Sequence, residues 1–215
     1  MPDLFEPPRY IVIEGPIRVG KSTLAGILAE RMGARLLREP EENRHLNAFY
    51  AGQPGAAFRA QMYFLQSRYQ QLAPWGPGRP RDPLVSDYLF EKDKIFACLN
   101  LSDDELEVYN PYYEMFHGQI PVPDLVIYLQ AGVPVLRERL ARRRMPAERE
   151  LSPEYLAEVV RAYDHFFAHY AQSDLLVIDT SEIDFVERNE DLRELLHRLS
   201  EPIKGTQYFL PLGQN

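Results

Sequence analysis

A phosphate-binding pattern near the amino terminus constrains this chain more than any other feature of its sequence. Residues 15–22 read Gly-Pro-Ile-Arg-Val-Gly-Lys-Ser and fit the pattern G-x-x-x-x-G-K-[ST]. The short apolar run 10–13 precedes the pattern, and the segment 21–32 that follows has the apolar spacing of a helix. A strand, a glycine-rich turn and a helix start in this order form a cradle for phosphate. The pattern therefore predicts a nucleoside triphosphate site in an α/β protein.

Each residue type in this pattern has a physical role. The glycines let backbone N–H groups close around phosphate oxygens. The Lys21 ammonium can reach the β and γ phosphates, and the Ser22 hydroxyl can bind Mg²⁺. We therefore expect ATP and Mg²⁺ as cofactors; a strand-to-helix turn without a ligand is the structural alternative. The predicted ATP-binding residues of the loop are Gly15, Pro16, Ile17, Arg18, Val19, Gly20, Lys21, Ser22 and Thr23.

Strand-like and helix-like segments alternate along the chain. Five short apolar runs have the pattern of strands buried on both faces of a sheet: 10–13, 35–37, 83–85, 125–129 and 175–178. Amphipathic segments are expected as helices: 21–32, about 58–72, from 102, from 134, 152–170 and about 190–199. This alternation predicts an α/β fold with a five-stranded parallel sheet and helices on both faces. Pro111 is expected to kink or split the helix that opens at Ser102, and the tail after Ser200 has no periodicity.

Composition argues against several classes of protein. The 215-residue chain has 24 Lys and Arg against 32 Asp and Glu, a formal net charge of −8. This charge argues against partners such as nucleic acid polymers and membrane surfaces, which attract basic proteins. Cys98 is the single cysteine, so an intramolecular disulfide cannot form. No apolar run approaches the roughly 18 residues of a membrane span, and residues 1–8 lack the apolar core of a signal peptide. We expect a cytoplasmic protein of one domain.

Carboxylates and arginines follow the predicted strands, at the edge where open parallel sheets bind ligands. Glu39 and Asp87 follow the second and third strands, and either could accept the proton of an attacking hydroxyl. Asp87 could instead hold Mg²⁺, and a loop carboxylate or a turn cap is the plain alternative for each. The arginines in 139–149 could close over phosphates as a lid, although a solvated helix face explains them as well.

One helical stripe carries residues suited to a nucleobase. Gln61 and Arg68 are seven residues apart among bulky aromatic neighbours, and a glutamine amide offers both a donor and an acceptor. The wet face of an amphipathic helix is the alternative. We find neither D-x-x-G nor N-K-x-D, the patterns of GTPase switches, and motor or transporter ATPases are longer. The residues thus indicate a small kinase of a metabolite; a nucleotide-binding regulatory protein without chemistry is the competing class.

Taken together, these residues resemble the deoxynucleoside kinase family, above all its bacterial deoxyadenosine and deoxyguanosine kinases. The resemblance covers nearly the whole chain and rests on these segments: 14–23, 39–40, 49–50, 58–68, 95–97, 124–130 and 153–156. It implies a single P-loop kinase domain over 1–215 with an arginine-rich lid at about 142–152, assembled as a homodimer. It also implies transfer of the ATP γ-phosphate to the 5′-hydroxyl of a deoxynucleoside substrate.

The resemblance further implies roles for individual residues. Glu39 is the general base, with Lys21, Asp87, Arg139 and Arg143 as the other catalytic residues. The acceptor is held by Glu39, by Tyr50 at the sugar 3′-hydroxyl, by Gln61 at the base, and by Arg68 and Asp93, although Lys92 takes the place of Asp93 in another alignment. Ser22 and Asp87 bind the metal. Residues near the ATP adenine are Ile183, Asp184 and Phe185.

Two features leave alternatives open. The family often has an arginine after the acidic residue that follows the third strand, where this chain has Tyr88; Arg18 or Arg144 could supply that charge.

Gln61 favours deoxyadenosine as the substrate. The alternative is a thymidylate kinase-like nucleoside monophosphate kinase, which also has an arginine in the phosphate loop and Arg-Glu-Pro after the second strand. Against it, Glu41 and Glu42 would repel an acceptor phosphate.

Overall fold

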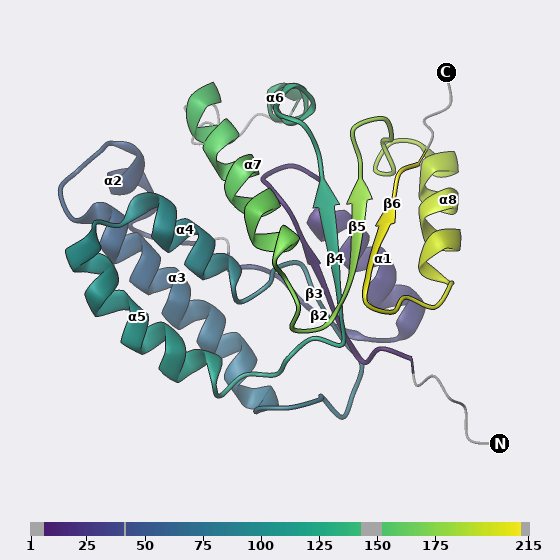
Figure 1. Ribbon diagram of the computed structural model, residues 1–215, viewed down its shortest axis with the longest axis horizontal. Helices are drawn as coiled ribbons and strands as arrows, with labels where there is room; N and C mark the ends of the chain where they lie inside the picture. The colour runs from purple at the N-terminus through teal and green to yellow at the C-terminus, as the bar shows by residue number, and fades with distance from the viewer. Residues whose placement is uncertain (1–6, 41, 143–151, 212–215) are drawn as a thin grey trace.

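In the described part of the chain, six parallel strands form the central sheet (Figure 1). The computed structural model describes residues 7–40, 42–142 and 152–211. The strands are β1 (Tyr10–Glu14), β2 (Arg35–Leu37), β3 (Leu84–Ser86), β4 (Leu125–Gln130), β5 (Asp174–Asp179) and β6 (Thr206–Phe209). They lie in the order β2-β3-β1-β4-β5-β6, and every pairing is parallel.

Helices cover both faces of this sheet, as predicted (Figure 1). They are α1 (Lys21–Met32), α2 (Leu46–Tyr50), α3 (Ala56–Leu72), α4 (Lys92–Asn100), α5 (Asp103–His117), α6 (Val133–Arg142), α7 (Pro153–Ala168) and α8 (Asn189–Leu199), with a short 3₁₀ helix η1 (Ala73–Trp75) after α3. Tyr10 and Val12 of β1 belong to one buried apolar cluster, and Ile11 and Ile13 to the other, because successive strand residues point to opposite faces. Helices α3, α4 and α5 pack in the first cluster, α1, α6 and α8 in the second, and α7 contributes to both.

The expected strand count of five is corrected to six. The five predicted strands are present, each within one residue of its expected bounds. The sixth, β6, comes from the tail after Ser200, where no element was predicted, and pairs with β5 at the edge of the sheet. Its four residues alternate between exposed and half-buried. They therefore lack the continuous apolar run that marks a strand buried on both faces.

Helix α5 is continuous through Pro111, so of the two expected outcomes the split is wrong and the kink stays a prediction. Proline removes one backbone hydrogen bond, but Tyr109 and Tyr113 on either side of it are buried in the apolar core. A capping box at Ser102 fixes the start of the helix, as its sequence indicated. Two helices, α2 and α4, were not predicted. Across the described residues, no helix is long and apolar enough to cross a membrane.

The parallel arrangement brings the carboxyl ends of the strands to one edge of the sheet. β1 ends at Glu14 and leads directly into the phosphate loop 15–20. Glu39 lies two residues after β2, and Asp87 directly follows β3. These residues therefore meet at the edge where open α/β sheets bind their ligands.

Candidate active site

The phosphate loop requires glycine at the two positions where its pattern has glycine. Gly15 has φ 150°, and a Cβ there would lie 2.3 Å from the carbonyl oxygen of Leu129 on β4. Gly20 has φ 109°, and its Cβ would lie 2.6 Å from the ring of Phe185. Arg18 also adopts a left-handed conformation, with φ 63°, which is uncommon for a residue with a side chain. The loop is thus a tight, sterically defined turn.

The residues after this turn form the anion-binding end of the site. Helix α1 begins at Lys21, and among the described residues no side chain caps its N-terminus at Gly20, so its first N–H groups can face an anion. The Lys21 ammonium bends back over the loop and donates to the carbonyl oxygens of Gly15 (2.8 Å) and Pro16 (3.1 Å). Burial, followed by the nearby positive charge of Lys92, lowers the pKa of Lys21 to about 8.

A cavity of about 750 Å³ opens beside the loop and brings nine of the predicted site residues together. Its wall includes the predicted residues Ile17, Arg18, Lys21, Ser22, Glu39, Tyr50, Gln61, Arg68 and Asp87. The phosphate loop and α1 form one part of this wall, the segments after β2 and β3 contribute Glu39 and Asp87, and α2, α3, α4 and α7 supply the rest. Aromatic side chains complete it: Phe49, Phe64, Phe96, Tyr155 and Tyr163. The cavity therefore combines an anion-binding end with an aromatic chamber of the kind that suits a flat, polar-edged ring.

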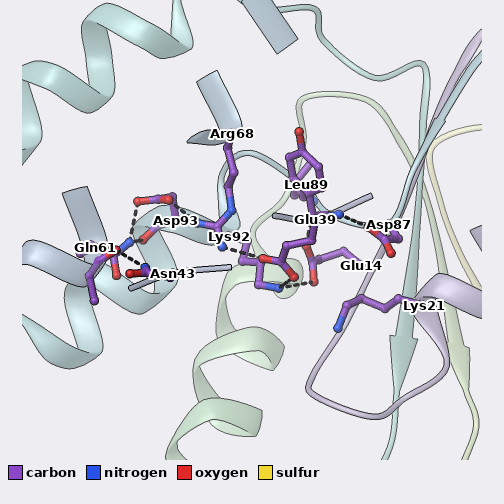
Figure 2. Close-up of polar contacts among 12 residues, drawn as sticks. Glu14, Lys21, Glu39, Asn43, Gln61, Arg68, Asp87, Leu89, Lys92 and Asp93 are labelled. Carbon is purple, nitrogen blue, oxygen red and sulfur yellow. Dashed lines mark hydrogen bonds and ion pairs between the residues drawn. The ribbon is translucent and has the colours of Figure 1, made fainter. Parts of the chain in front are cut away.

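Glu39 is held on the wall of this cavity by three contacts (Figure 2). Arg68 donates to Oε1 at 2.6 Å, Lys92 donates to Oε2 at 2.7 Å, and the backbone N–H of Glu39 donates to Asp87 Oδ1 at 2.6 Å. Burial alone would raise the pKa of Glu39, but the charges of Lys92, Arg68 and Lys21 outweigh it and hold that pKa well below its usual range. Glu39 is thus a fixed, ionised carboxylate.

Gln61 and Arg68 are both oriented by Asp93, which is fully buried behind them (Figure 2). Gln61 Nε2 donates to the backbone oxygen of Asp93 at 2.8 Å and to its Oδ1 at 2.5 Å. Tyr109 donates to Oδ1 at 2.8 Å, and Arg68 NH1 bonds Oδ2. Both amide hydrogens of Gln61 are therefore engaged, which leaves its carbonyl oxygen as the group that can accept from a ligand. Asp93 itself is not part of the cavity wall.

A second cavity of about 270 Å³ lies on the other side of the phosphate loop. Its wall consists of Arg18, Val19, Gly20, Lys21, Ser22, Thr23, Arg139, Arg142, Asp184, Phe185, Val186 and Glu187. Asp184 and Phe185, which were predicted near the ATP adenine, thus lie on this wall. Ile183 does not: its side chain is buried in the second apolar cluster. Since Arg18, Lys21 and Ser22 border both cavities, the loop separates two chambers that share one anion-binding end.

Arg139, predicted as a lid arginine, anchors the chain that follows β5. Its guanidinium donates to the backbone oxygens of Thr180 (2.8 Å) and Ile183 (3.0 Å) and to the Thr180 hydroxyl (3.2 Å). Arg139 therefore holds the wall of the second cavity, and its predicted catalytic role stays a prediction. Arg143 and nearly all of the predicted lid at 142–152 lie outside the described residues.

Two charged side chains at this site were missed by the sequence analysis or given another role. Lys92, considered there only as an alternative base contact, is the ion-pair partner of Glu39. Glu14 is fully buried and accepts from the N–H groups of Gly15 (2.8 Å) and Leu89 (2.7 Å) and from the Tyr163 hydroxyl (3.1 Å). A carboxylate that ends an apolar strand directly before the phosphate loop was the available signal for Glu14.

Comparisons with known proteins agree on one family. A family model described as deoxynucleoside kinase matches residues 11–204. The chain is 31% identical over 201 residues to deoxyguanosine kinase of Bacillus subtilis (strain 168), which covers 90% of this chain and 97% of that protein. It is 26% identical over 211 residues to deoxyadenosine kinase of Lactobacillus acidophilus, and this alignment covers 91% of this chain and 97% of that protein. The solved structure of deoxyadenosine kinase from M. mycoides with bound dATP matches with a TM-score of 0.74 at 22% identity, over 90% of this chain and 100% of that one. This last likeness shows the P-loop kinase fold.

Proposed function

The chain belongs to the deoxynucleoside kinase family, and on that premise we propose that it transfers the γ-phosphate of ATP to the 5′-hydroxyl of a purine deoxynucleoside. The relatives named above are deoxyguanosine and deoxyadenosine kinases, which favours a nucleoside over a nucleoside monophosphate as the acceptor. The observation that carries the proposal is the ionised Glu39 carboxylate, fixed on the wall of a chamber that shares its anion-binding end with the phosphate loop. One domain over 1–215 remains our expectation.

In this proposal the two chambers have different occupants. The adenine of ATP lies in the smaller cavity against Phe185, and the triphosphate follows the phosphate loop to Lys21. The deoxynucleoside occupies the larger cavity, with its base toward Gln61, its sugar 3′-hydroxyl near Tyr50 and its 5′-hydroxyl at Glu39. The 5′-oxygen attacks the γ-phosphorus, its proton passes to the Glu39 carboxylate, and the bond from that phosphorus to the β–γ bridging oxygen breaks to release ADP. Most of the rate enhancement then comes from positioning and charge.

A neutral acceptor hydroxyl suits the electrostatics at Glu39. Because the carboxylate is ionised and fixed by Arg68 and Lys92, it can accept a hydrogen bond from an alcohol without reorganising. An acceptor phosphate placed at the same point would face this negative charge and would have to compete with it for both cations. The chamber therefore favours a nucleoside over a nucleotide as the acceptor.

We further propose that the triphosphate binds together with Mg²⁺ at Ser22 and Asp87. The serine hydroxyl and the carboxylate lie on the wall of the same cavity, and they are oxygen ligands of the kind that Mg²⁺ prefers. Such an ion takes few protein ligands and completes its shell with phosphate oxygens and waters. When bound, it neutralises charge on the phosphates.

The proposed preference for deoxyadenosine rests on Gln61. Its amide hydrogens are both engaged by Asp93, so it offers an acceptor to the base, and the 6-amino group of adenine is a matching donor. The ring N1–H of guanine is a donor as well, so deoxyguanosine is the second candidate.

A panel of acceptors tests the proposed function. We expect labelled phosphate to pass from ATP to deoxyadenosine and deoxyguanosine with kcat/KM at least about 10-fold higher than for deoxycytidine and thymidine, the scale of a few matched polar contacts. The kcat/KM for deoxyadenosine should exceed that for deoxyguanosine. A preference for dTMP over every deoxynucleoside would overturn the proposal.

We also propose a cytoplasmic homodimer. The exposed apolar side chains Val108, Tyr112 and Met115 all lie on α5, and exposed apolar patches are common at interfaces between subunits. Light scattering of the purified chain should give twice the mass of one chain, and a Val108→Glu, Met115→Glu double variant should shift it toward the single-chain mass. A monomer at micromolar concentration would contradict this expectation.

A further inference from the structure

Lys92 lies at a position that is unfavourable for a lysine for two physical reasons. It is the first residue of α4, where the positive end of the helix dipole disfavours a cation. Its side chain is only 8% exposed, and burying an ammonium costs several kcal/mol unless it is paired. Local rules broken in this way are typical of functional positions.

The partners of Lys92 explain both costs (Figure 2). Its Nζ lies 2.7 Å from Glu39 Oε2 and 4.0 Å from Glu14 Oε1. Glu14 is fixed by the N–H groups of Gly15 and Leu89, so Lys92 connects a rigid carboxylate beside the phosphate loop to the carboxylate that faces the acceptor. The ammonium thereby helps to fix the Glu39 carboxylate relative to the phosphate loop.

The Glu39 side chain needs its own restraint, because the bond from its backbone N–H to Asp87 Oδ1 fixes the main chain but not the carboxylate. Glu39 follows β2, which has three residues and no fully buried one. Arg68 restrains only Oε1, about which the carboxylate can still rotate. With Lys92 on Oε2, both oxygens have charged donors, and such pairs fix geometry as well as charge.

We propose that Lys92 is a positioning residue for phosphoryl transfer, which acts by holding the Glu39 carboxylate in register with the phosphate loop. This inference rests on the proposed function. It predicts that Lys92 affects turnover through Glu39 and has little effect of its own once Glu39 is changed. It also predicts that the charge of Lys92 is the property that matters.

Single variants test the charge requirement. Lys92→Met keeps a side chain of similar length but removes the ammonium, which also lies over the Phe96 ring. It should lower kcat about 10- to 50-fold with the nucleoside KM within about threefold, the scale of one charge-assisted hydrogen bond. Lys92→Arg, which keeps a positively charged donor for the Glu39 carboxylate, should restore kcat to within about threefold of wild type. Lys94→Met is the matched control, because Lys94 lies on the same helix turn but pairs with Asn110 and two tyrosine rings away from the cavity. A Lys92→Met enzyme with wild-type kcat, or an arginine variant as impaired as the methionine variant, would overturn the proposal.

A double-mutant cycle with Glu39→Gln tests whether Lys92 acts through Glu39. In the Glu39→Gln background, Lys92→Met should lower kcat by less than about twofold, since coupled residues are not additive. Two fully additive losses would show that Lys92 acts elsewhere and would overturn the proposal.

The same four proteins also give a readout that does not depend on turnover. Lys92→Met should shift the urea midpoint of unfolding more in the wild-type background than in the Glu39→Gln background, and equal shifts would contradict the pairing. If the wild-type chain phosphorylates no deoxynucleoside, the proposed function is wrong. The unfolding measurements still show in that case whether Lys92 holds Glu39.

Discussion

Glutamine in place of Glu39 should lower kcat about 100-fold or more, the usual cost of losing a general base, while the affinity for ATP stays unchanged. The amide occupies the same volume but cannot take the proton of the 5′-hydroxyl. It also removes the negative charge that pairs with Arg68 and Lys92. ATP affinity should be retained because Glu39 lies on the wall of the larger cavity only, away from the chamber beside Phe185. Steady-state kinetics and equilibrium binding of an ATP analogue separate the two effects.

Glu42→Gln is the matched control for this experiment. Glu42 lies three residues further along the same loop, but its side chain is exposed, so its replacement should leave kcat within about twofold, as is usual for surface changes. Turnover near the wild-type level in Glu39→Gln would remove Glu39 from the role of proton acceptor.

Methionine in place of Lys21 should lower kcat about 100- to 1,000-fold, the scale seen when one preorganised donor to a developing charge is removed. Lys21 borders both cavities at their shared end, as Arg18 does. Among the described residues, its ammonium donates to two carbonyl oxygens of the loop. It can therefore turn toward a phosphate at the cost of two neutral hydrogen bonds. Methionine keeps the length of the stem but offers no charge to the γ-phosphate.

Thermal unfolding and ATP binding should accompany this kinetic measurement. Lys204→Met is the control. Lys204 is a surface lysine whose side chain is 63% exposed and pairs with Asp174, and neither residue lines the two cavities. It should behave as wild type. A Lys21→Met enzyme that retains more than about a tenth of wild-type kcat would contradict the part assigned to Lys21 in transfer.

Local patterns predicted the parts of the site that follow buried strands. The phosphate loop could be predicted because steric limits at Gly15 and Gly20 leave glycine as the residue that fits there. Glu39 and Asp87 could be expected at one edge because short apolar runs before them marked two parallel strands, although only β3 is fully buried. Gln61 and Arg68 could be placed on one helical stripe by their spacing of seven. In each case a short segment carries the whole signal.

Other features depend on contacts between distant segments and could not be predicted this way. Lys92 and Glu39 are 53 residues apart, and nothing in the sequence near either residue indicates the ion pair between them. Asp93 was expected to hold the acceptor, a role that stays a prediction. The structure buries it behind Gln61 and Arg68, and its carboxylate serves three donors at once, which no local pattern indicated. β6 escaped prediction since an edge strand of four half-exposed residues has no apolar run.

A crystal structure with a purine deoxynucleoside and a non-hydrolysable ATP analogue tests most directly whether Glu39 receives an acceptor alcohol opposite the phosphate loop. We expect the 5′-oxygen within about 3.2 Å of a Glu39 carboxylate oxygen, as a proton acceptor requires, and the terminal phosphate of the analogue beside Lys21. A nucleoside bound with its 5′-oxygen away from Glu39, or an acceptor phosphate seated between Arg68 and Lys92, would contradict the account.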